Sequence, residues 1–436
     1  MARVVVVGGG YGGLASAARL AKNGHEVTLL EAAPRLGGAV GTVEQDGFRW
    51  DSGPTSTLLP AVARDLFRKS GRALDRELDL VPVDPRRHRF EDGTSLDLPA
   101  GSRGAQLAAV SDALGDGAGA AWTAYVDAFA EDWEALRKDY LERPFVADQA
   151  SRQALALLGT RMTLHKALTR SFKDQRLRAM ASFATDLEGH DLRNVPAWMG
   201  MWSYVEQNFG VWTVPGGMGR LGEALAARLA TRGVTVRTST PARDVVVRGG
   251  RAVAVRTDEG DLDADVVVCA VDPRRLPALA PFVESTMPAI PPVVCHLGLT
   301  GEVPDLPHET VLHGDPLLVV RTGGSAPPGA HAWTVLARGR IAEDLVTALA
   351  RRDLRVRDQV EVRVDRSPRA QVEEWGGSPY GVLWQGRATV TRRLGPRTPV
   401  PGVFAAGAHA TPGAGLAAVG LSAALVSQVV GPSADR

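Results

Sequence analysis

A glycine-rich turn between two short apolar strands, all within the first 31 residues, constrains the fold of this chain most. Residues 3–7 read Arg-Val-Val-Val-Val and predict a buried strand, because consecutive valines leave no polar face. Three glycines in G-x-G-x-x-G spacing follow the strand: Gly8, Gly10 and Gly13. An apolar helical pattern covers 14–23, and a second strand over 26–30 ends in Glu31. These elements, in this order, predict one βαβ dinucleotide-binding unit.

Each part of this unit has a physical role. The first glycine permits a tight turn, the second lets the main chain approach a pyrophosphate, and the third lets helix and strand pack closely. The helix N-terminus offers unpaired N–H groups and a partial positive charge to the phosphates. Glu31 can accept hydrogen bonds from a ribose, and its charge would repel a 2′-phosphate, which argues against NADP. An ordinary glycine-rich turn is the competing interpretation, but it does not explain the strands or the acid.

Length and composition restrict the remaining possibilities. A chain of 436 residues is expected to form two or three units. A net charge of +1 gives no reason to expect nucleic-acid binding. The two cysteines, Cys269 and Cys295, lie in apolar runs and predict buried thiols, with no disulfide framework and no metal cluster. Such thiols fit a reducing cytosol, which is the expected compartment. No secretory signal is visible.

The C-terminal stretch 403–433 contains no Asp, Glu, Lys or Arg and has the length of a membrane span. It is nevertheless rich in glycine, alanine and serine and contains Pro412, His409 and Gln428. We therefore expect a buried strand and helix here rather than a transmembrane segment.

The segment directly after Glu31 carries a resemblance to a known family. Residues 31–38 read E-A-x-x-R-x-G-G, which resembles the flavin amine oxidase and phytoene desaturase superfamily. In that superfamily the arginine and the paired glycines line the FAD pyrophosphate, so the resemblance implies FAD as the dinucleotide. Residues 48–55 are similar to the superfamily stretch G-F-x-F-D-x-G-P-T, which implies a backbone turn near the isoalloxazine ring at Pro54 and Thr55.

The middle of the chain contains a second resemblance and a second glycine pattern. Residues 209–221 resemble the family's return into the FAD domain, G-V-W-x-P-x-G-G-x-x-x-L. Another G-x-G-x-x-G is found here, at Gly217, Gly219 and Gly222. Pro215 shortens the strand before it and the strand at 234–237 ends without an acid, so a turn opening a helix over 221–232 is favoured over a second nucleotide site. The resemblance further implies that the backbone of Ala242 contacts the adenine.

The C-terminal stretch is similar to the carotenoid desaturase signature, a strand, G-A-x-x-x-P-G-x-G and a helix with a Ser-Ala pair. The helix N-terminus would then point at the flavin pyrimidine and favour the charge of reduced flavin. Leu416-Ala417-Ala418-Val419 replaces the frequent I-P-G-V, and Ala408 favours the desaturase branch over the amine oxidase branch. The resemblance implies these cofactor-binding residues: Gly8, Gly10, Tyr11, Gly12, Gly13, Glu31, Ala32, Arg35, Gly38, Ala39, Pro54, Thr55, Ala242, Gly407, Ala408, Gly415, Ala418 and Val419.

The expected fold class is α/β, with a Rossmann-type FAD-binding domain of the glutathione-reductase kind, an α+β substrate domain and a helical insertion. The FAD-binding domain is expected to be discontinuous, over 1–80, 215–285 and 395–436. Short strands predict the substrate domain at 81–104 and 286–394, interrupted by a helix around 341–354. Helical patterns dominate 105–214 and predict a lid on the substrate side.

Within the lid, residues 149–180 combine leucines with a high density of basic side chains and contain one acid, Asp174. A basic amphipathic stretch suits the interface of an anionic membrane. A solvated charged face on a lid helix explains the same pattern. The two interpretations stay open, although the resemblance favours peripheral membrane contact, because phytoene desaturases take their substrate from lipid.

The resemblance implies an FAD-dependent oxidoreductase similar to phytoene desaturases, acting on an apolar polyene or isoprenoid. Flavin N5 would take hydride from an allylic C–H, and a proton would leave the adjacent carbon. The sequence identifies no catalytic base; His190, Glu188 and His409 are candidates by location only. Quinone and dioxygen are both compatible electron acceptors.

Two alternatives remain at this point. A flavin amine oxidase would release hydrogen peroxide with amines and would need an aromatic cage, to which Trp212, Trp375 and Trp384 are candidates. A flavin-containing carotenoid or lipid binder without turnover would leave the flavin oxidised when it meets its ligand.

Overall fold

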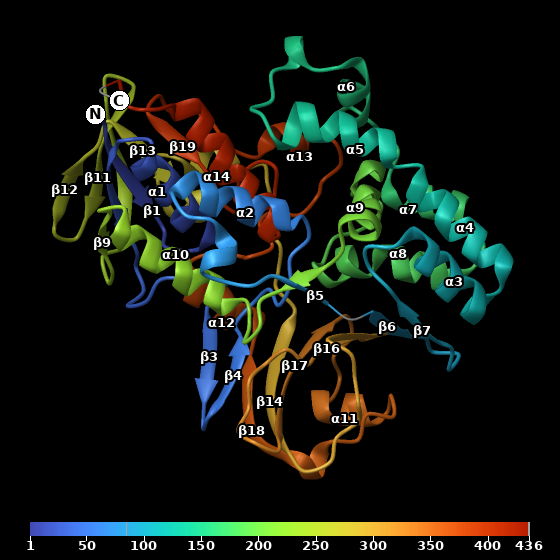
Figure 1. Ribbon diagram of the computed structural model, residues 1–436. Coiled ribbons are helices and arrows are strands. Elements are labelled where there is room, and N and C mark those ends of the chain that lie inside the picture. Colours follow the sequence, from blue (N-terminus) through green and yellow to red (C-terminus); the bar gives the residue numbers. More distant parts are fainter. Residues whose placement is uncertain (84, 435–436) are drawn as a thin grey trace.

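A computed structural model describes residues 1–83 and 85–434. Five parallel strands form one sheet in the order β19-β13-β1-β2-β9. Their bounds are β1 Arg3–Val7, β2 Glu26–Leu30, β9 Thr235–Arg237, β13 Val266–Cys269 and β19 Val403–Ala405. The sheet therefore joins the first residues of the chain to the last, as the sequence predicted for the two terminal motifs (Figure 1).

The four valines of β1 face two different cores. Val4 and Val6 lie in one apolar cluster with the helices on one side of the sheet, and Val5 and Val7 lie in a second cluster on the other side. The helices of the first side are α1 Tyr11–Lys22, α2 Pro60–Ser70, α10 Gly219–Thr231 and α14 Leu416–Val430. On the second side lies a three-stranded antiparallel sheet of β10 Ala242–Arg248, β11 Arg251–Thr257 and β12 Gly260–Asp263. Burial on both faces explains why the strand has no polar residue between Val4 and Val7.

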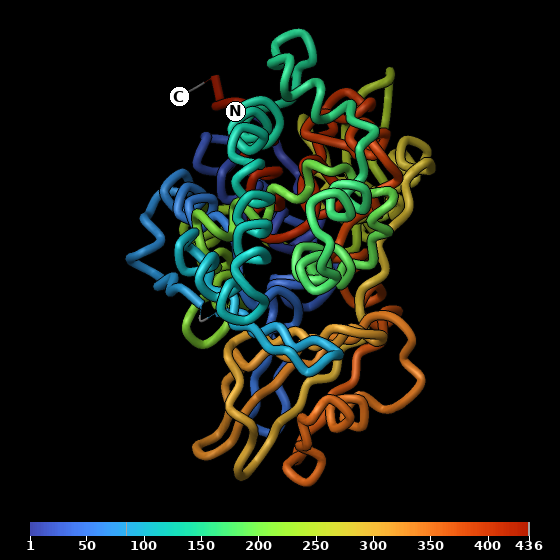
Figure 2. The backbone as a smooth tube through the Cα atoms, turned by 90° about the vertical axis from the view of Figure 1, so that its right-hand side faces the viewer, coloured from blue at the N-terminus to red at the C-terminus, as the bar shows by residue number. Residues whose placement is uncertain are grey.

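A second, larger sheet has seven strands in the order β18-β14-β17-β16-β15-β6-β7 and lies at the bottom of Figures 1 and 2. Its strands are antiparallel neighbours except for β15 and β6, which are parallel. The bounds are β6 Arg86–Arg89, β7 Ser95–Leu98, β14 Val293–Thr300, β15 Glu309–Leu312, β16 Leu317–Arg321, β17 Ala330–Arg338 and β18 Val360–Arg366. The helix expected around 341–354 is shorter, α11 Leu345–Ala350, because Asp344 caps its first turn and a left-handed residue, Asp353, follows.

A hairpin of β3 Thr42–Gln45 and β4 Phe48–Asp51 connects the two sheets. Phe48 and Trp50 pack against Ala332 of the seven-stranded sheet, and the Trp50 indole N–H donates to the carbonyl of Leu297. The remaining short helices are α12 Pro368–Trp375 and α13 Thr389–Arg392.

The helical region contains α3 Arg103–Leu114, α4 Asp116–Asp127, α5 Ala130–Leu136, α6 Arg152–Leu158, α7 Leu164–Ser171, α8 Gln175–Leu187 and α9 Met201–Phe209. It stands above the seven-stranded sheet and beside the parallel sheet (Figures 1 and 2). β5 Val81–Pro82, which precedes β6, pairs with β8 Trp212–Thr213, which follows α9. The strand predicted at the start of 81–98 therefore pairs outside the larger sheet. The division into a cofactor domain, a substrate domain and a helical lid, with its boundaries, stays a prediction.

Four charged side chains tie the helical region to the seven-stranded sheet. Arg86 of β6 contacts Glu206 of α9 at 2.7 Å and Glu309 of β15 at 2.6 Å. Arg321 of β16 contacts the other oxygen of Glu309 at 2.8 Å. All four side chains are at most 15% exposed, so each charge depends on the others for compensation.

The uncharged C-terminal stretch forms β19 and α14, and α14 packs against α1 and α2 inside the protein. Among residues 1–83 and 85–434, no helix is long and apolar enough to cross a bilayer. Both cysteines are free and buried, and burial raises the pKa of each thiol to about 12. The predictions of a buried strand and helix and of buried thiols are confirmed.

Candidate cofactor site

The first glycine turn packs tightly against its own strand, except at one position. A Cβ placed on Gly13 would lie 1.8 Å from the carbonyl oxygen of Gly8, and a Cβ on Gly8 would lie 2.6 Å from Val271. Gly13 therefore allows the close packing of helix and strand that the sequence predicted, and Gly8 lets the turn lie against Val271, which follows β13. A Cβ on Gly10 would meet no atom within 4 Å. Gly10 borders open space at the start of α1, where the motif would hold a pyrophosphate.

The two ends of the chain meet at Gly12. A Cβ placed on Gly12 would lie 2.7 Å from the Cα of Gly407 and 3.3 Å from Val419. The Gly407 N–H donates to the buried hydroxyl of Ser422, which fixes the loop after β19 against α14. Tyr11 is buried, and its hydroxyl would be 3.3 Å from a Cβ on Gly420 of α14. The N-terminal and C-terminal motifs therefore form one site, with the first turns of α1 and α14 side by side.

Residues 31–39 run along the same turn. Glu31 accepts the N–H of Gly9 at 2.5 Å and that of Ala33 at 2.8 Å. The Gly37 N–H donates to the carbonyl of Gly9, and a Cβ on Gly38 would lie 3.1 Å from the Cα of Gly10. Glu31 is thus held beside the glycine turn. Ala32 and Arg35 are exposed.

Two further predicted segments lie against 31–39. A Cβ on Gly53 would be 2.6 Å from the carbonyl oxygen of Ala39, which places the turn with Pro54 and Thr55 next to that segment. The Thr55 hydroxyl is buried without a hydrogen-bond partner among the described residues. The Thr240 N–H donates to the carbonyl of Glu31, two residues before Ala242 begins β10. The structure therefore brings the five segments that contain the predicted residues together around α1.

The residues present fit an anionic dinucleotide. Gly10 and Gly415 are the N-cap residues of α1 and α14, and neither helix has a side-chain capping bond. A Cβ on Gly415 would also meet no atom within 4 Å. Unpaired N–H groups and the positive end of each helix dipole thus face open space, which suits phosphate or flavin oxygens. Ala408 and Ala418 lie in the same C-terminal loop and first turn of α14.

The second glycine run is not free to bind a nucleotide in this way. The buried carboxylate of Asp51 accepts the N–H groups of Met218 at 3.0 Å and Gly219 at 2.9 Å, at the start of α10. A Cβ on Gly222 would lie 2.4 Å from the carbonyl of Val40. Burial raises the pKa of Asp51 although these N–H groups oppose the shift. The run opens a helix and packs it against residues 40–42, as the sequence favoured.

Comparison with known proteins identifies the family to which this site belongs. Residues 11–430 match the family described as flavin containing amine oxidoreductase. The chain belongs to this flavin-containing amine oxidoreductase family. It is therefore an oxidoreductase, and the resemblance drawn from the motifs is confirmed.

Among members of the family, this chain is similar to carotenoid desaturases. It is 32% identical to the hydroxyneurosporene desaturase of Cereibacter sphaeroides, over 96% of this chain and 95% of that protein. It is 29% identical to the phytoene dehydrogenase of Streptomyces griseus, over 99% and 96%. A zeta-carotene-forming phytoene desaturase of Myxococcus xanthus is 30% identical over 72% of this chain and 63% of that protein.

Solved structures of the family share the fold. A putrescine oxidase variant superposes with a TM-score of 0.72 at 16% identity and covers 98% of both chains. The cyclohexylamine oxidase of Brevibacterium oxydans superposes with a TM-score of 0.64 at 16% identity, over 98% of this chain and 99% of that one. The predicted α/β fold class is confirmed.

The three candidates for a base, His190, Glu188 and His409, differ in whether they have an atom that can still accept a proton. His190 accepts the backbone N–H of Trp384 on Nδ1 at 3.3 Å, so its proton lies on Nε2, 3.3 Å from Glu188. A neutral His190 therefore has no lone pair to spare. His409 lies between Ser378 and Asp272, and burial lowers its pKa. Glu188 keeps acceptor capacity.

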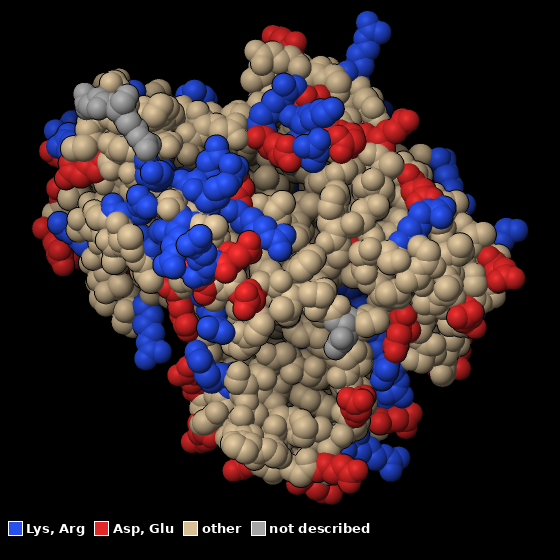
Figure 3. All heavy atoms as spheres, in the orientation of Figure 1, with Lys and Arg blue, Asp and Glu red and all other residues tan. Residues whose placement is uncertain are grey.

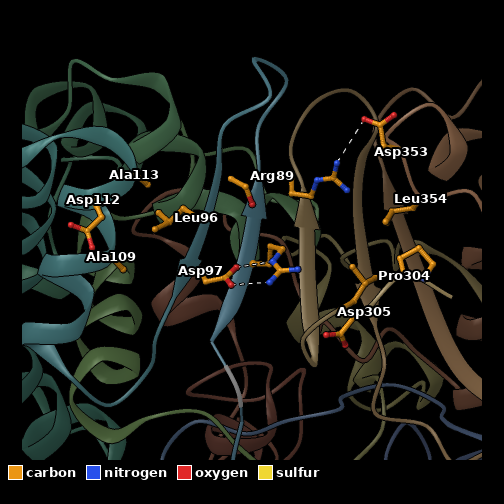
Figure 4. Close-up of a pocket in the computed structure, with 13 residues that line it drawn as sticks. Arg89, Leu96, Asp97, Ala109, Asp112, Ala113, Pro304, Asp305, Asp353 and Leu354 are labelled. Atoms are coloured by element: carbon orange, nitrogen blue, oxygen red, sulfur yellow. Dashed lines mark hydrogen bonds and ion pairs between the residues drawn. The ribbon is translucent and has the colours of Figure 1, made fainter.

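His190 also lines an open cleft of about 1050 Å³ between the helical region and the seven-stranded sheet. Arg338 and His313 contribute from the sheet, and Phe183 and Asp186 from α8. A second hollow, shown in Figure 4, lies between α3, the β6–β7 hairpin and residues 304–306. Its arginines are paired with Asp97 and Asp353, and none of the predicted cofactor residues lines it.

The three tryptophans considered for an amine-binding cage lie in different surroundings. Trp212 faces Arg64, Trp375 faces Arg366, and Trp384 packs edge-on against Trp198. No ring contact joins any two of the three in the part of the chain described. This arrangement gives no support to an amine cage built from them.

Two residues near the site had no signal in the sequence. Asp51 lies in a stretch that resembles a family motif, but its capping of α10 depends on a residue 167 positions away. Arg393 follows another arginine in an unpatterned segment, and the structure places it against the C-terminal loop. Only the three-dimensional arrangement reveals either role.

Proposed function

We propose that this chain binds FAD and desaturates an apolar polyene or isoprenoid of the carotenoid class. The meeting of Gly12 with Gly407 supports the cofactor, because it joins both terminal motifs in one site. The full-length similarity to a hydroxyneurosporene desaturase supports the substrate class. The amine oxidases match at 16% identity and support the fold alone.

FAD would supply the acceptor for a hydride from an allylic carbon. The chain itself supplies binding and orientation: uncapped helix N-termini at α1 and α14 for oxygens, and Glu31 beside the turn for a ribose. The apolar cluster of the helical region extends to Ala417 and Leu421 of α14, so one side of this helix lies among aliphatic and aromatic side chains. Such apolar surroundings beside α14 suit a polyene and would exclude water.

Anaerobic mixing with acyclic polyenes tests this function. The flavin-loaded protein should lose its yellow absorbance as a partly saturated acyclic carotenoid gains conjugation and absorbs at longer wavelength. A retained yellow colour with bound polyene would identify a non-catalytic binder, and peroxide release with amines would identify an amine oxidase. Reoxidation by a quinone or by dioxygen then distinguishes the two acceptors.

We also propose that the face of α6 and α7 contacts anionic membranes. The apolar positions Leu158, Leu164 and Leu168 are buried in the core of the helical region, so the leucine half of the pattern is explained by packing. The exposed basic residues from this stretch are Arg152, Arg161, His165, Lys166, Arg170 and Lys173. Leu155 and Val146 are 40% and 45% exposed beside them. Figure 3 shows basic side chains projecting at the rim of the helical region.

The double variant Lys166→Glu/Arg170→Glu should lose affinity for vesicles that contain anionic lipid. Each basic residue near such a surface contributes about 1 kcal/mol, so we expect binding roughly tenfold weaker or more in a sedimentation assay. The matched control Arg248→Glu/Arg355→Glu changes the net charge equally at exposed sites elsewhere. Equal weakening by both pairs, or no vesicle binding by the unaltered protein, would contradict a membrane-facing α6 and α7.

A further inference from the structure

Arg393 is a buried arginine that the proposed chemistry has not used. It follows α13 and is 8% exposed. Its guanidinium donates to the carbonyl of Pro412 at 3.1 Å and to that of Val382 at 3.2 Å, and it lies 4.3 Å from the centre of the Trp384 ring. Its Nε is buried without a hydrogen-bond partner among the described residues. Two neutral carbonyls and one aromatic ring therefore hold this cation in place.

The other fully buried arginines are compensated differently. Arg19, Arg228 and Arg366 are equally buried, and each contacts a carboxylate, on Asp65, Glu77 and Glu374 respectively. Within residues 1–83 and 85–434, Arg393 has no carboxylate within ion-pair distance. The titratable groups that face it are Tyr140, Glu188 and His409.

Burial lowers the pKa of Arg393, in keeping with a cation that none of the described carboxylates contacts. A buried charge without a partner is unfavourable, and an anion that arrives beside it is correspondingly stabilised.

The position of Arg393 indicates which anion its charge would stabilise. A Cβ on Gly413 would lie 3.0 Å from its guanidinium, so the charge touches the loop between β19 and α14. Trp384 and Val390 of the same segment pack in one cluster with Ala417 and Leu421 of α14. The cation therefore stands at the loop that leads into the uncapped N-terminus of α14. Both features place positive potential on the same side of the candidate site.

We propose that Arg393 is a positioning residue that supplies the fixed positive charge for reduced flavin. A hydride carries two electrons and one proton, so its transfer to oxidised flavin leaves one negative charge on the ring system. Arg393, held by Pro412 and Val382, stabilises that charge together with the first turn of α14 and so makes flavin reduction more favourable. This inference rests on the FAD-binding part of the proposed function and not on the identity of the substrate.

The test compares Arg393→Met and Arg393→Lys with Arg392→Met, which removes the exposed arginine next in sequence. The readouts are the flavin midpoint potential, from dye-equilibrated reduction of the flavin-loaded protein, and the protons taken up per two electrons below neutral pH. Arg393→Met should shift the reduction equilibrium at least tenfold toward oxidised flavin, about 30 mV for a two-electron couple. Arg393→Lys should retain most of the potential, and Arg392→Met should leave it unchanged.

Proton uptake keeps the inference testable if Arg393→Met fails to fold. The unaltered protein should take up one proton per two electrons, because its reduced flavin stays anionic, and uptake of two would overturn the inference without any variant. An unchanged potential in flavin-loaded Arg393→Met would overturn it too. Weaker substrate binding at unchanged potential would assign the cation to an oxygen of the substrate instead. Failure of the unaltered protein to take up FAD would count against the proposed function.

Discussion

The variant Gly10→Val is expected to fold normally and to lose FAD. Gly10 has ordinary backbone angles, φ −73° and ψ 178°, and no atom lies within 4 Å of a Cβ placed there. The added Cβ therefore meets no protein atom, and the side chain fills the space in which the pyrophosphate would approach the main chain. We expect FAD binding at least roughly 100-fold weaker, about 2.7 kcal/mol, by titration of the apoprotein followed by flavin fluorescence.

Substitutions at two other glycines serve as controls. They distinguish a blocked cofactor site from a general effect of replacing glycine with valine. Gly104→Val on α3 also adds a side chain in open space and should leave FAD binding unchanged. Gly12→Val should reduce both folding and binding, because its Cβ collides with Gly407 and separates the two terminal motifs. If Gly10→Val bound FAD like the unaltered protein, the open space at the start of α1 would not be the pyrophosphate site.

The variant Glu309→Ala is expected to cause the largest loss of stability. Glu309 compensates both Arg86 and Arg321, and its removal leaves two arginines with a single carboxylate, Glu206, between them. Breaking a buried ion pair by removing one partner costs about 3–5 kcal/mol, and we expect a loss of this size in the free energy of urea unfolding. Asp127→Ala, which removes an exposed partner of Arg103, should leave the unfolding midpoint unchanged. Similar effects of the two variants would contradict a stabilising role for the buried cluster.

The same variant should change how stability depends on pH. Although burial opposes the shift, Arg321 and Arg86 hold the pKa of Glu309 well below its ordinary value of 4.5. A carboxylate with a depressed folded-state pKa stabilises the protein above its unfolded-state pKa and loses this contribution as pH falls toward the folded-state value. The stability difference between the unaltered protein and Glu309→Ala should therefore be constant above about pH 5 and narrow below about pH 4.5. Urea unfolding at several pH values measures it.

The sequence predicted most of the parallel sheet because its signals are local. Four consecutive valines predicted β1, and the uncharged stretch 403–433 predicted the buried strand and helix that the structure shows as β19 and α14. The role of the basic stretch 149–180 could not be assigned from the sequence, because the spacing of its leucines fits both a lid core and a membrane face. The structure assigns Leu158, Leu164 and Leu168 to the core, while the exposed cations carry no contact that decides their role.

The charged contacts of the site and of the helical region were not predictable. Asp51 caps a helix that begins 168 positions later, and Arg86 meets Glu309 across 223 positions. Such pairs have no periodicity, because each depends on how separate segments fold against one another. Arg393 was missed for the same reason: its missing counter-ion is a property of its surroundings and not of its neighbours in sequence.

The order of strands in the parallel sheet has a consequence for how the protein is made. β1 pairs with β13, and β13 pairs with β19, so the edge strand and the helix beside Gly12 are synthesised only after the other four strands of the sheet. A nascent chain that ends before Val403 has the glycine turn but lacks Gly407 and Val419, which face Gly12 on the other side of the site. The site that we propose for FAD is therefore incomplete until β19 and α14 have been synthesised, and we expect a nascent chain that ends before Val403 not to retain the nucleotide.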